Sequence, residues 1–251
     1  MSSSIWTQCA GDSELRPLRL APWRVVESQH QVSTRKLVDS ASEQELLEDL
    51  IESVKPADVT RGRLHYLLFT PFRYPPLKYG SRFGTRNERG IWYGSLDLRT
   101  AFAEVSYYRL VFLEGTRADL GTVTTALTAF TVTLRTLRGI SLDTAPFDAH
   151  RADISSPSSY VFSQQLGRDM RAAGTEAFRY WSARDVAGGI NVGVLSPVAF
   201  GRSKPKSFQT WHCAASRDLV DVVAADYFKR DGFAFPRSQF LVDGVLPLPA
   251  P

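Results

Sequence analysis

The spacing of apolar side chains predicts an amphipathic helix just before residue 110. Side chains recur every three or four positions, at Leu98, Ala101, Phe102 and Val105, followed by Arg109. Ser95 is placed to cap this helix, and Asp97 in the first turn suits the positive end of the helix dipole. Glu104 lies beside the apolar stripe. Its carboxylate is therefore expected to border a buried cleft.

Two further helices are predicted from the same periodicity. One covers residues 39–51, carries leucines on one face, and begins with a capping box from Ser42 to Glu45. The other covers residues 158–173 and ends at Gly174. Its inward side chains are predicted to be Val161, Phe162, Leu166 and Met170.

Short runs rich in β-branched and aromatic residues, some of them alternating with period two, predict the strands. The predicted strands are residues 64–69, 91–93, 128–134, 177–184, 190–195, 207–213 and 219–224. Residues 1–35 are expected to form an irregular arm that docks through its aromatic side chains, and the proline-rich end of the chain is expected to be loose. Clustered strands with a few helices between them indicate an α+β domain, with a mixed or mostly antiparallel sheet flanked by helices.

This pattern divides the chain into a central domain with an extension at each end. Residues 1–60 are predicted to form an N-terminal arm and a helix that packs on the core. Residues 61–225 form the central domain, and residues 226–251 form a C-terminal tail.

The composition is that of an ordinary globular protein with a mild positive charge. Hydrophobic residues make up 43% and charged residues 22% of the 251 residues, and the formal net charge is +4. The pI of about 9.1 is compatible with nucleic acid, with a phosphorylated small molecule, or with an acidic protein as partner.

The cysteines and the apolar runs bear on location. Cys9 and Cys213 suggest no disulfide framework, and we read both as free thiols in a reducing compartment. The sequence has no apolar run of about eighteen residues and no secretory signal pattern, so we expect no membrane span and a cytoplasmic protein. No metal site is expected, because no histidine lies at ligand spacing from another histidine or a cysteine.

One short stretch gathers groups suited to a small anion. Arg82, Arg86 and Arg89 lie in one loop, and arginines fork onto phosphate oxygens. Tyr93 at a strand end offers a ring that stacks on a flat ligand, and Glu104 can stabilise positive charge that develops beside it. Taken singly, each of these residues is also explained as solvated surface.

Together with two later motifs, this stretch resembles the RES domain, a family of bacterial toxins usually encoded beside an Xre-type antitoxin. The matching motifs are Arg82-Phe83, Tyr93 at the strand end, Thr100-Ala101-Phe102-Ala103-Glu104, Ser163-Gln164-Gln165-Leu166-Gly167 and Tyr180-Trp181-Ser182-Ala183-Arg184. Trp181 stands where the family often has proline before its serine. The resemblance covers roughly residues 60 to 215.

The resemblance implies a fold like that of ADP-ribosyltransferases, in which two small sheets pack around a cleft for NAD, the substrate. No metal is implied. Glu104 is then the catalytic carboxylate, and Arg82 holds the pyrophosphate, with Arg86 a weaker candidate. Tyr93 stacks on the nicotinamide ring, and Ser182 hydrogen-bonds the ribose or a phosphate oxygen.

The acceptor of the ADP-ribosyl group stays open at this point. Water gives NAD hydrolysis, inorganic phosphate gives phosphorolysis, and a side chain of a target protein gives mono-ADP-ribosylation. The resemblance also implies an Xre-like antitoxin as partner, and it allows for a homodimer within the complex with that antitoxin. A reading from another class is a basic module that binds nucleic acid through Arg73, Lys78, Arg82, Arg86 and Arg89.

Overall fold

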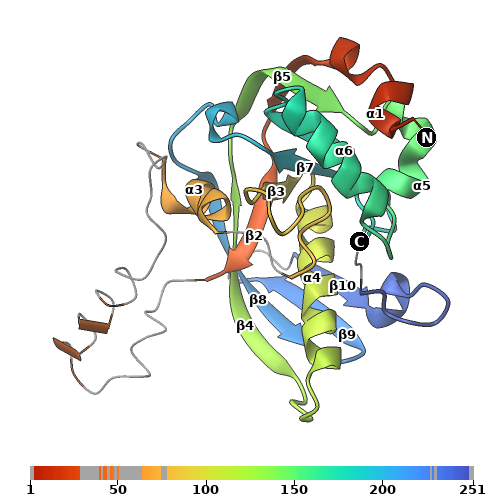
Figure 1. The fold of residues 1–251 in the computed structure, drawn as a ribbon. Coiled ribbons are helices and arrows are strands. Elements are labelled where there is room, and N and C mark those ends of the chain that lie inside the picture. Colours follow the sequence, from red (N-terminus) through yellow and green to blue (C-terminus); the bar gives the residue numbers. More distant parts are fainter. Residues whose placement is uncertain are drawn as a thin grey trace.

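One mixed sheet of ten strands runs through the part of the chain that the computed structural model describes (Figure 1). The described residues are 3–28, 64–74, 78–226 and 231–248, together with Phe228 and isolated residues between 40 and 50. In pairing order, the strands are β1 (Arg16–Leu20), β5 (Leu134–Ser141), β6 (Ala177–Trp181), β7 (Ile190–Val194), β3 (Trp92–Ser95), β2 (Trp23–Glu27), β4 (Val123–Thr131), β8 (Lys206–Ala215), β9 (Leu219–Ala224) and β10 (Gly232–Pro236). β5 and β6 pair in parallel and the other pairs are antiparallel, which confirms the predicted α+β class with a mixed sheet.

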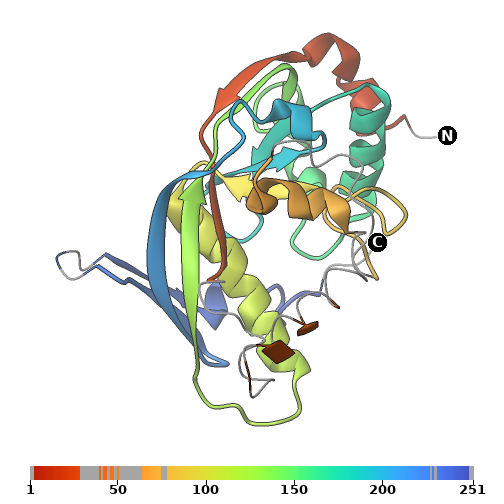
Figure 2. The ribbon, with the colours of Figure 1, turned by 90° about the vertical axis from the view of Figure 1, so that its left-hand side faces the viewer.

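Helices cover this sheet in separate groups. The α-helices are α1 (Ile5–Gln8), α3 (Tyr66–Arg73), α4 (Leu98–Gly115), α5 (Arg151–Ile154) and α6 (Val161–Ala172), and the 3-10 helices are η1 (Gly11–Glu14), η3 (Phe147–His150), η4 (Pro197–Ala199) and η5 (Arg237–Phe240). α6 packs with α1 and α5 at one end of the molecule (Figure 1). α4 contacts β2, β8, β9 and β10 and runs alongside the long strands β4 and β8 (Figure 2).

α4 forms where the apolar stripe predicts it, and its buried side chains join the largest hydrophobic cluster. Phe102, Tyr107 and Leu110 are almost fully buried there against strands β4, β8, β9 and β10. Each such side chain contributes about 1.5–3 kcal/mol through burial. The predicted cap was wrong: the N-cap is Asp97, while Ser95 is the last residue of β3 and its hydroxyl donates to Asn191 instead.

The sheet is almost divided in two where β2 meets β3. These strands pair at a single position, Trp23 with Ser95, whereas β2 and β4 pair over the whole length of β2. The two small sheets implied by the resemblance are therefore joined into one in the described chain, because β2 hydrogen-bonds to both halves. The narrow junction lies beside the first half of α4, and it leaves side chains of both halves facing the same helix.

The N-terminal arm is more regular than predicted. Within residues 3–28 the chain forms α1, η1, β1 and β2, and β2 lies inside the sheet between β3 and β4. Sequence patterns miss this because the partners of β2 lie about a hundred residues further along, where Trp23 pairs with Thr131. Pro17 is tolerated in β1 because β1 is an edge strand of the sheet.

The predicted strand over residues 64–69 is wrong, because this segment begins α3. His65 caps the helix, with its Nδ1 accepting a hydrogen bond from the backbone N–H of Leu67 at 3.3 Å. Leu68 and Phe72, four residues apart, are buried on the same face. A short apolar run does not separate a buried strand from a buried helix, and the capping histidine decides between them here.

α6 confirms the helix predicted over residues 158–173, but only two of its four predicted inward side chains are buried. Leu166 and Met170 are buried, whereas Val161 and Phe162 are 51% and 53% exposed. The helix turns Gly167 towards the backbone of the loop before β3, where an added Cβ would lie 2.0 Å from the carbonyl oxygen of Phe83. This close approach fixes the rotation of the helix, and apolar spacing alone does not reveal it.

Two other predicted segments differ in the structure. The single strand predicted over residues 128–134 is split, because β4 ends at Thr131 and β5 starts at Leu134. The C-terminal segment expected to be loose contains β10, which pairs with β9, and it buries Leu246. Most of the predicted helix over residues 39–51, including Glu45 of the predicted capping box, lies outside the described residues; among the residues described there, Ser40 and Glu43 exchange hydrogen bonds of the capping-box kind.

The remaining predicted strands are confirmed with shifted ends, since β3, β6, β7, β8 and β9 overlap the predicted segments. Cys9 and Cys213 are buried free thiols, and burial raises the pKa of both.

Among the described residues, no helix is both long and apolar enough to cross a bilayer. The same residues hold no group of three or more histidine, cysteine, aspartate or glutamate side chains that could bind a metal ion.

Candidate functional site

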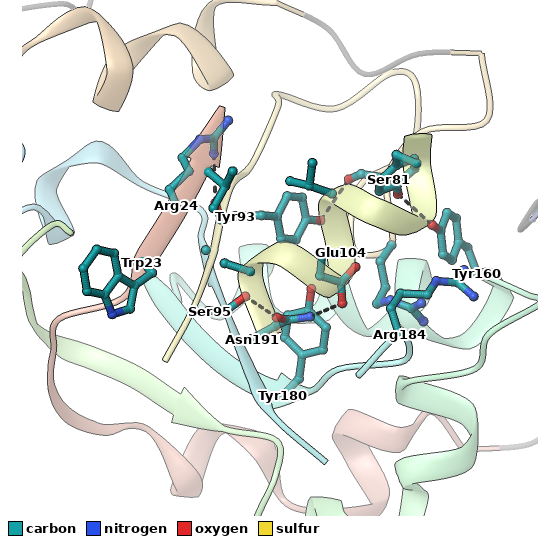
Figure 3. A pocket seen from close by; sticks show the side chains of 16 residues that line it. Trp23, Arg24, Ser81, Tyr93, Ser95, Glu104, Tyr160, Tyr180, Arg184 and Asn191 are labelled. Carbon is teal, nitrogen blue, oxygen red and sulfur yellow. Dashed lines mark hydrogen bonds between the residues drawn. The ribbon is translucent and has the colours of Figure 1, made fainter. Parts of the chain in front are cut away.

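A cavity of about 270 Å³ opens beside the junction of β2 and β3, against the first half of α4 (Figure 3). Glu104 is the carboxylate of its lining, and three arginines, Arg24, Arg82 and Arg184, share the wall with it. Four tyrosines also line the cavity: Tyr93, Tyr108, Tyr160 and Tyr180. The cavity therefore combines one carboxylate with an excess of positive charge and flat rings.

The carboxylate of Glu104 is held through one of its two oxygens. Oε1 accepts a hydrogen bond from Ser182 Oγ at 2.7 Å and another from Asn191 Nδ2 at 2.5 Å. Asn191 is itself fixed, since its Oδ1 accepts a hydrogen bond from Ser95 Oγ at 2.7 Å. Ser95 and Asn191 are each only 2% exposed, so this chain of contacts is shielded from water. These contacts set the direction in which the carboxylate faces the cavity.

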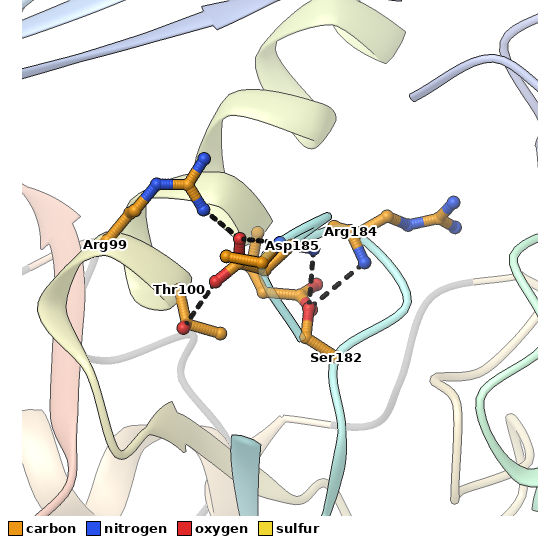
Figure 4. Close-up of polar contacts among 7 residues, drawn as sticks. Arg99, Thr100, Ser182, Arg184 and Asp185 are labelled. Carbon is orange, nitrogen blue, oxygen red and sulfur yellow. Dashed lines mark hydrogen bonds and ion pairs between the residues drawn. The ribbon is translucent and has the colours of Figure 1, made fainter. Parts of the chain in front are cut away.

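Ser182 is positioned by the turn that follows β6 (Figure 4). Its Oγ accepts hydrogen bonds from the backbone N–H groups of Arg184 and Asp185, both at 3.0 Å. With two donors facing it, the hydroxyl must direct its own proton to Glu104. Ser182 thus acts on the carboxylate within hydrogen-bond distance, and it is not part of the cavity lining.

The same turn is fastened to the start of α4 by Asp185. Its Oδ2 accepts a hydrogen bond from Thr100 Oγ1 at 2.7 Å, and its Oδ1 pairs with the guanidinium of Arg99. Gly189 passes so close that an added Cβ would lie 1.9 Å from Thr100 Oγ1. These contacts hold the turn firmly against α4, the helix that carries Glu104 (Figure 4).

Tyr93 lies in β3 and lines the cavity, but it is the second of the four residues of that strand and not, as predicted, its last, because the strand continues to Ser95. The hydroxyl is 2.9 Å from Ser81 Oγ and accepts a hydrogen bond from the backbone N–H of Phe83 at 3.3 Å. Burial raises the pKa of Tyr93 to about 12, so its hydroxyl is neutral at physiological pH. The carbonyl oxygen of Tyr93 accepts a hydrogen bond from Arg24 at 2.9 Å.

The surroundings of Arg82 and Arg86 differ, although both residues lie in the loop before β3. Arg82 is 8% exposed, and its Nη1 donates to the carbonyl oxygen of Ser156 at 2.7 Å. Its guanidinium also lies 5.1 Å from the ring centre of Tyr160. Arg86 is exposed and is not among the residues that line the cavity. The structure thus brings Arg82, Tyr93, Glu104 and Ser182 together and leaves Arg86 outside.

Sequence reasoning missed several residues of this site. Arg24 comes from the segment expected to be an irregular arm, and only the pairing of β2 with β3 brings it here. Asn191 was placed in a strand without any role, and its approach to Glu104 depends on the pairing of β7 with β3. Arg184 was noted only as part of a motif. Its Nη1 is buried and has no hydrogen-bond partner within the described ranges, and its guanidinium packs against the ring of Tyr107.

A single carboxylate beside arginines and tyrosines, in a mixed α+β domain, defines a class of site built for a ligand that is both anionic and aromatic. The model of the RES domain matches residues 55–216, well over half of the chain, and the protein belongs to the RES domain family.

Other comparisons add a structural likeness. The chain is similar to one in the crystal structure of the MbcT-MbcA toxin-antitoxin complex of M. tuberculosis, with 10% sequence identity and a TM-score of 0.49. The similarity covers 83% of this chain and 91% of that one. The search of curated proteins finds no match.

Proposed function

We propose that this protein is the toxin of a bacterial toxin–antitoxin system and that it cleaves the bond between nicotinamide and ribose in NAD. The observation that carries the proposal is the carboxylate of Glu104, fixed through Oε1 at the wall of a cavity rich in arginines and tyrosines. Membership of the RES domain family supports the same proposal.

The chemistry needs few groups because the leaving group is already activated. The pyridinium nitrogen takes the bonding electron pair and departs as neutral nicotinamide, so no acid has to protonate it. Positive charge then develops on the ribose ring, as in glycoside cleavage, and one carboxylate suffices to stabilise it. A preorganised group of this kind contributes about two to three powers of ten in rate. Glu104 supplies this group.

The neighbours of Glu104 take the roles that the resemblance implies. Tyr93 presents its ring to the nicotinamide, and Arg82 lies across the cavity as a cation for the phosphates. Arg24 and Arg184 add two further cations to the same wall. Ser182 orients the carboxylate through its hydroxyl, which is already engaged by Glu104 and by the backbone N–H groups of Arg184 and Asp185.

The acceptor of the ADP-ribosyl group distinguishes two enzyme classes. We propose attack by water or inorganic phosphate, which makes the protein an NAD glycohydrolase or phosphorylase. Transfer to a side chain of a target protein is the alternative, and it uses the same site. The products separate these reactions: free ADP-ribose, ADP-ribose 1″-phosphate, or a modified protein.

We propose that control comes from a separate protein. An enzyme that consumes a central cofactor must be held inactive in its own cell, and the family resemblance implies an Xre-like antitoxin encoded alongside. An acidic segment or a terminal carboxylate of that partner would suit the three arginines of the cavity. The cytoplasm, where NAD and such a partner meet, is the proposed location.

The deciding experiment measures NAD consumption by the purified protein with and without inorganic phosphate, comparing wild type with Glu104→Gln. The amide is isosteric but carries no charge, so we expect at least a hundredfold loss of turnover. Glu114→Gln is the matched control, because Glu114 lies on the same helix and pairs with Arg237 away from the cavity. Wild-type turnover by Glu104→Gln would contradict the proposal. So would salt-dependent binding of nucleic acid by a wild-type protein that leaves NAD intact.

A further inference from the structure

A second, larger cavity of about 580 Å³ adjoins the one that holds Glu104. One of its walls is α3, which contributes the side chains of Tyr66, Leu67, Thr70 and Pro71, and Tyr74 follows directly after the helix. The two cavities share four lining residues: Arg24, Ser81, Tyr93 and Tyr108. A ligand that fills the first cavity and extends past these residues therefore enters the second.

The sizes of the two cavities make such an extension necessary for a dinucleotide. Pockets that enclose small ligands usually have about 300–1,000 Å³, and the Glu104 cavity, at about 270 Å³, lies just below this range. It accommodates one nucleotide half of a dinucleotide but not both. With the nicotinamide ribose placed at Glu104, the other half has to lie outside the first cavity.

The wall of the second cavity has the chemistry of a surface on which a base stacks. Tyr66 and Tyr74 are 43% and 39% exposed, and the leucine, proline and isoleucine side chains beside them are apolar. An aromatic ring stacks on any nucleobase, since every base offers a flat π-face. A nucleoside is therefore a better match to this wall than a phosphate or a peptide.

The wall is also fixed in place before any ligand arrives. Arg89 Nε donates to the carbonyl oxygen of Phe72 at 3.3 Å, which ties α3 to the loop before β3. In that loop Gly90 packs so closely that an added Cβ would lie 2.0 Å from the carbonyl oxygen of Pro71. A preformed wall costs little ordering when a ligand binds.

The boundary between the cavities carries a positive charge. Arg24 lies there, with its Nη1 bound to the carbonyl oxygen of Tyr93 and its guanidinium 5.2 Å from the ring centre of Trp92. Burial lowers the pKa of Arg24 to about 10, so the side chain is still cationic at neutral pH. A negatively charged linker between two nucleosides suits this position.

From this geometry we propose that the cavity against α3 binds the adenosine half of the dinucleotide, with the base stacked on Tyr66 or Tyr74. This subsite rests on the proposed function, because it takes NAD as the ligand of the Glu104 cavity. The subsite also extends the proposed function, because the affinity for NAD then depends on α3, a helix that does not contact the bond that is cleaved.

Binding of fragments by the full chain tests the subsite. Calorimetric titration with adenosine monophosphate, ADP-ribose and nicotinamide compares wild type with Tyr66→Ala and Tyr74→Ala. Loss of base stacking is expected to weaken binding of the two adenosine ligands roughly fivefold to a hundredfold in at least one variant. Nicotinamide should bind unchanged. For NAD turnover, KM should rise by a similar factor while kcat stays within about twofold.

Two comparisons separate stacking from a general effect on the fold. The Tyr→Phe variant at the sensitive position keeps the ring and should restore wild-type affinity. Tyr79→Ala is the matched control, since Tyr79 is also exposed and nearby but does not line the second cavity. Unchanged affinity for adenosine monophosphate and ADP-ribose in both alanine variants would overturn the subsite, as would failure of the wild type to bind either ligand.

The same measurements keep the two proposals apart. If the wild type binds ADP-ribose in a way that depends on Tyr66 or Tyr74 but does not consume NAD, the subsite stands and the proposed function falls. If NAD is consumed with the same KM in wild type and both alanine variants, the proposed function stands and the subsite falls.

Discussion

The two oxygens of the Glu104 carboxylate have different neighbours. Oε1 accepts hydrogen bonds from Ser182 Oγ and Asn191 Nδ2, so its lone pairs are already used by the protein. Oε2 is therefore the oxygen available to a substrate. Asn191 contributes to this asymmetry from a buried position, since its other amide atom is held by Ser95. We regard Asn191 as a positioning residue that acts through Glu104.

Asn191→Leu tests this role. Leucine has a similar size but cannot donate, and a hydrogen bond to a charged group contributes about 1.5–3 kcal/mol. We expect kcat for NAD cleavage to fall about tenfold to a hundredfold, with KM within about twofold of wild type. Steady-state kinetics provides both values.

Two variants show whether that loss is specific. Asn87→Leu makes the same change at an exposed loop position and should leave kcat unaltered. The double variant Ser95→Ala with Asn191→Leu should be no slower than Asn191→Leu alone, because Ser95 reaches Glu104 only through Asn191. Full additivity of the two losses would argue against a shared chain of contacts.

Among single residues, the sequence indicated those that lie within recognisable motifs. Arg82, Tyr93 and Glu104 follow one another in one stretch, and the structure places all three around one cavity. Asn191 and Arg24 gave no such sign, because each depends on a strand pairing between distant segments. Arg86 was a candidate for binding phosphate, but its side chain is exposed outside the cavity. The sequence of a loop does not show in which direction an arginine side chain points.

At the scale of elements, the turn after β6 and the first turns of α4 determine the site together. Asp185 binds Thr100 and Arg99 of the helix, while the backbone of the turn holds Ser182. Gly188 has φ of +75°, a conformation that favours glycine, and so lets the turn close over the helix. The distance between Ser182 and Glu104 is thus set by how tightly these two elements are joined.

Gly189→Ala is expected to separate the two elements. The new Cβ would lie 1.9 Å from Thr100 Oγ1 and 2.7 Å from Asp185 Oδ2, so the turn must move away from α4. We expect a loss of about 1–3 kcal/mol in the free energy of unfolding, typical of overpacking. NAD turnover should fall as well, because Ser182 moves with the turn. Chemical denaturation and kinetics on the same protein sample measure both effects.

Gly115→Ala serves as the control, because Gly115 is the last residue of α4 and lies at the helix end opposite to the one that Gly189 contacts. No atom lies within 4 Å of the Cβ that would be added at Gly115. This variant should keep wild-type activity and stability or gain slightly, since alanine favours helix more than glycine. If Gly189→Ala behaves like Gly115→Ala, the turn is not clamped in the manner described.

The elements themselves were only partly predictable. α4, α6 and the four strands from β6 to β9 follow from periodicity, because their buried faces repeat over enough residues. α3 was mistaken for a strand, since its apolar run is short and the deciding cap is a histidine. The rotation of α6 depends on the close approach of Gly167 to Phe83, which is a property of the packed structure.

At the scale of the whole molecule, the α+β class could be predicted, but the order of the strands could not. β2 comes early in the chain and lies at the junction of the sheet, where it pairs with strands from two distant segments. The cavity lies beside that junction and is lined by residues of both β2 and β3. The site is thus a consequence of topology, and residue motifs locate only the part of it contributed by one stretch of the chain.

A test on the whole protein addresses its proposed role in the cell. Expression of the chain alone is expected to stop growth and to lower the cellular NAD level, because no inhibitor is present. Co-expression of the neighbouring gene for a DNA-binding protein should restore both. The Glu104→Gln variant should permit growth without the partner. Normal growth and constant NAD during expression of the wild-type chain would contradict the toxin and the antitoxin proposals together.

The C-terminal segment touches the same helix that carries Glu104. Tyr107, three residues further along α4, donates its hydroxyl proton to the carbonyl oxygen of Pro247, and the guanidinium of Arg184 lies 3.5 Å from the centre of its ring. The C-terminal segment thereby holds Tyr107, whose ring packs against the guanidinium of Arg184, in position. Loss of the segment that contains Pro247 is therefore expected to remove the acceptor of the Tyr107 hydroxyl and to loosen the ring against which Arg184 packs.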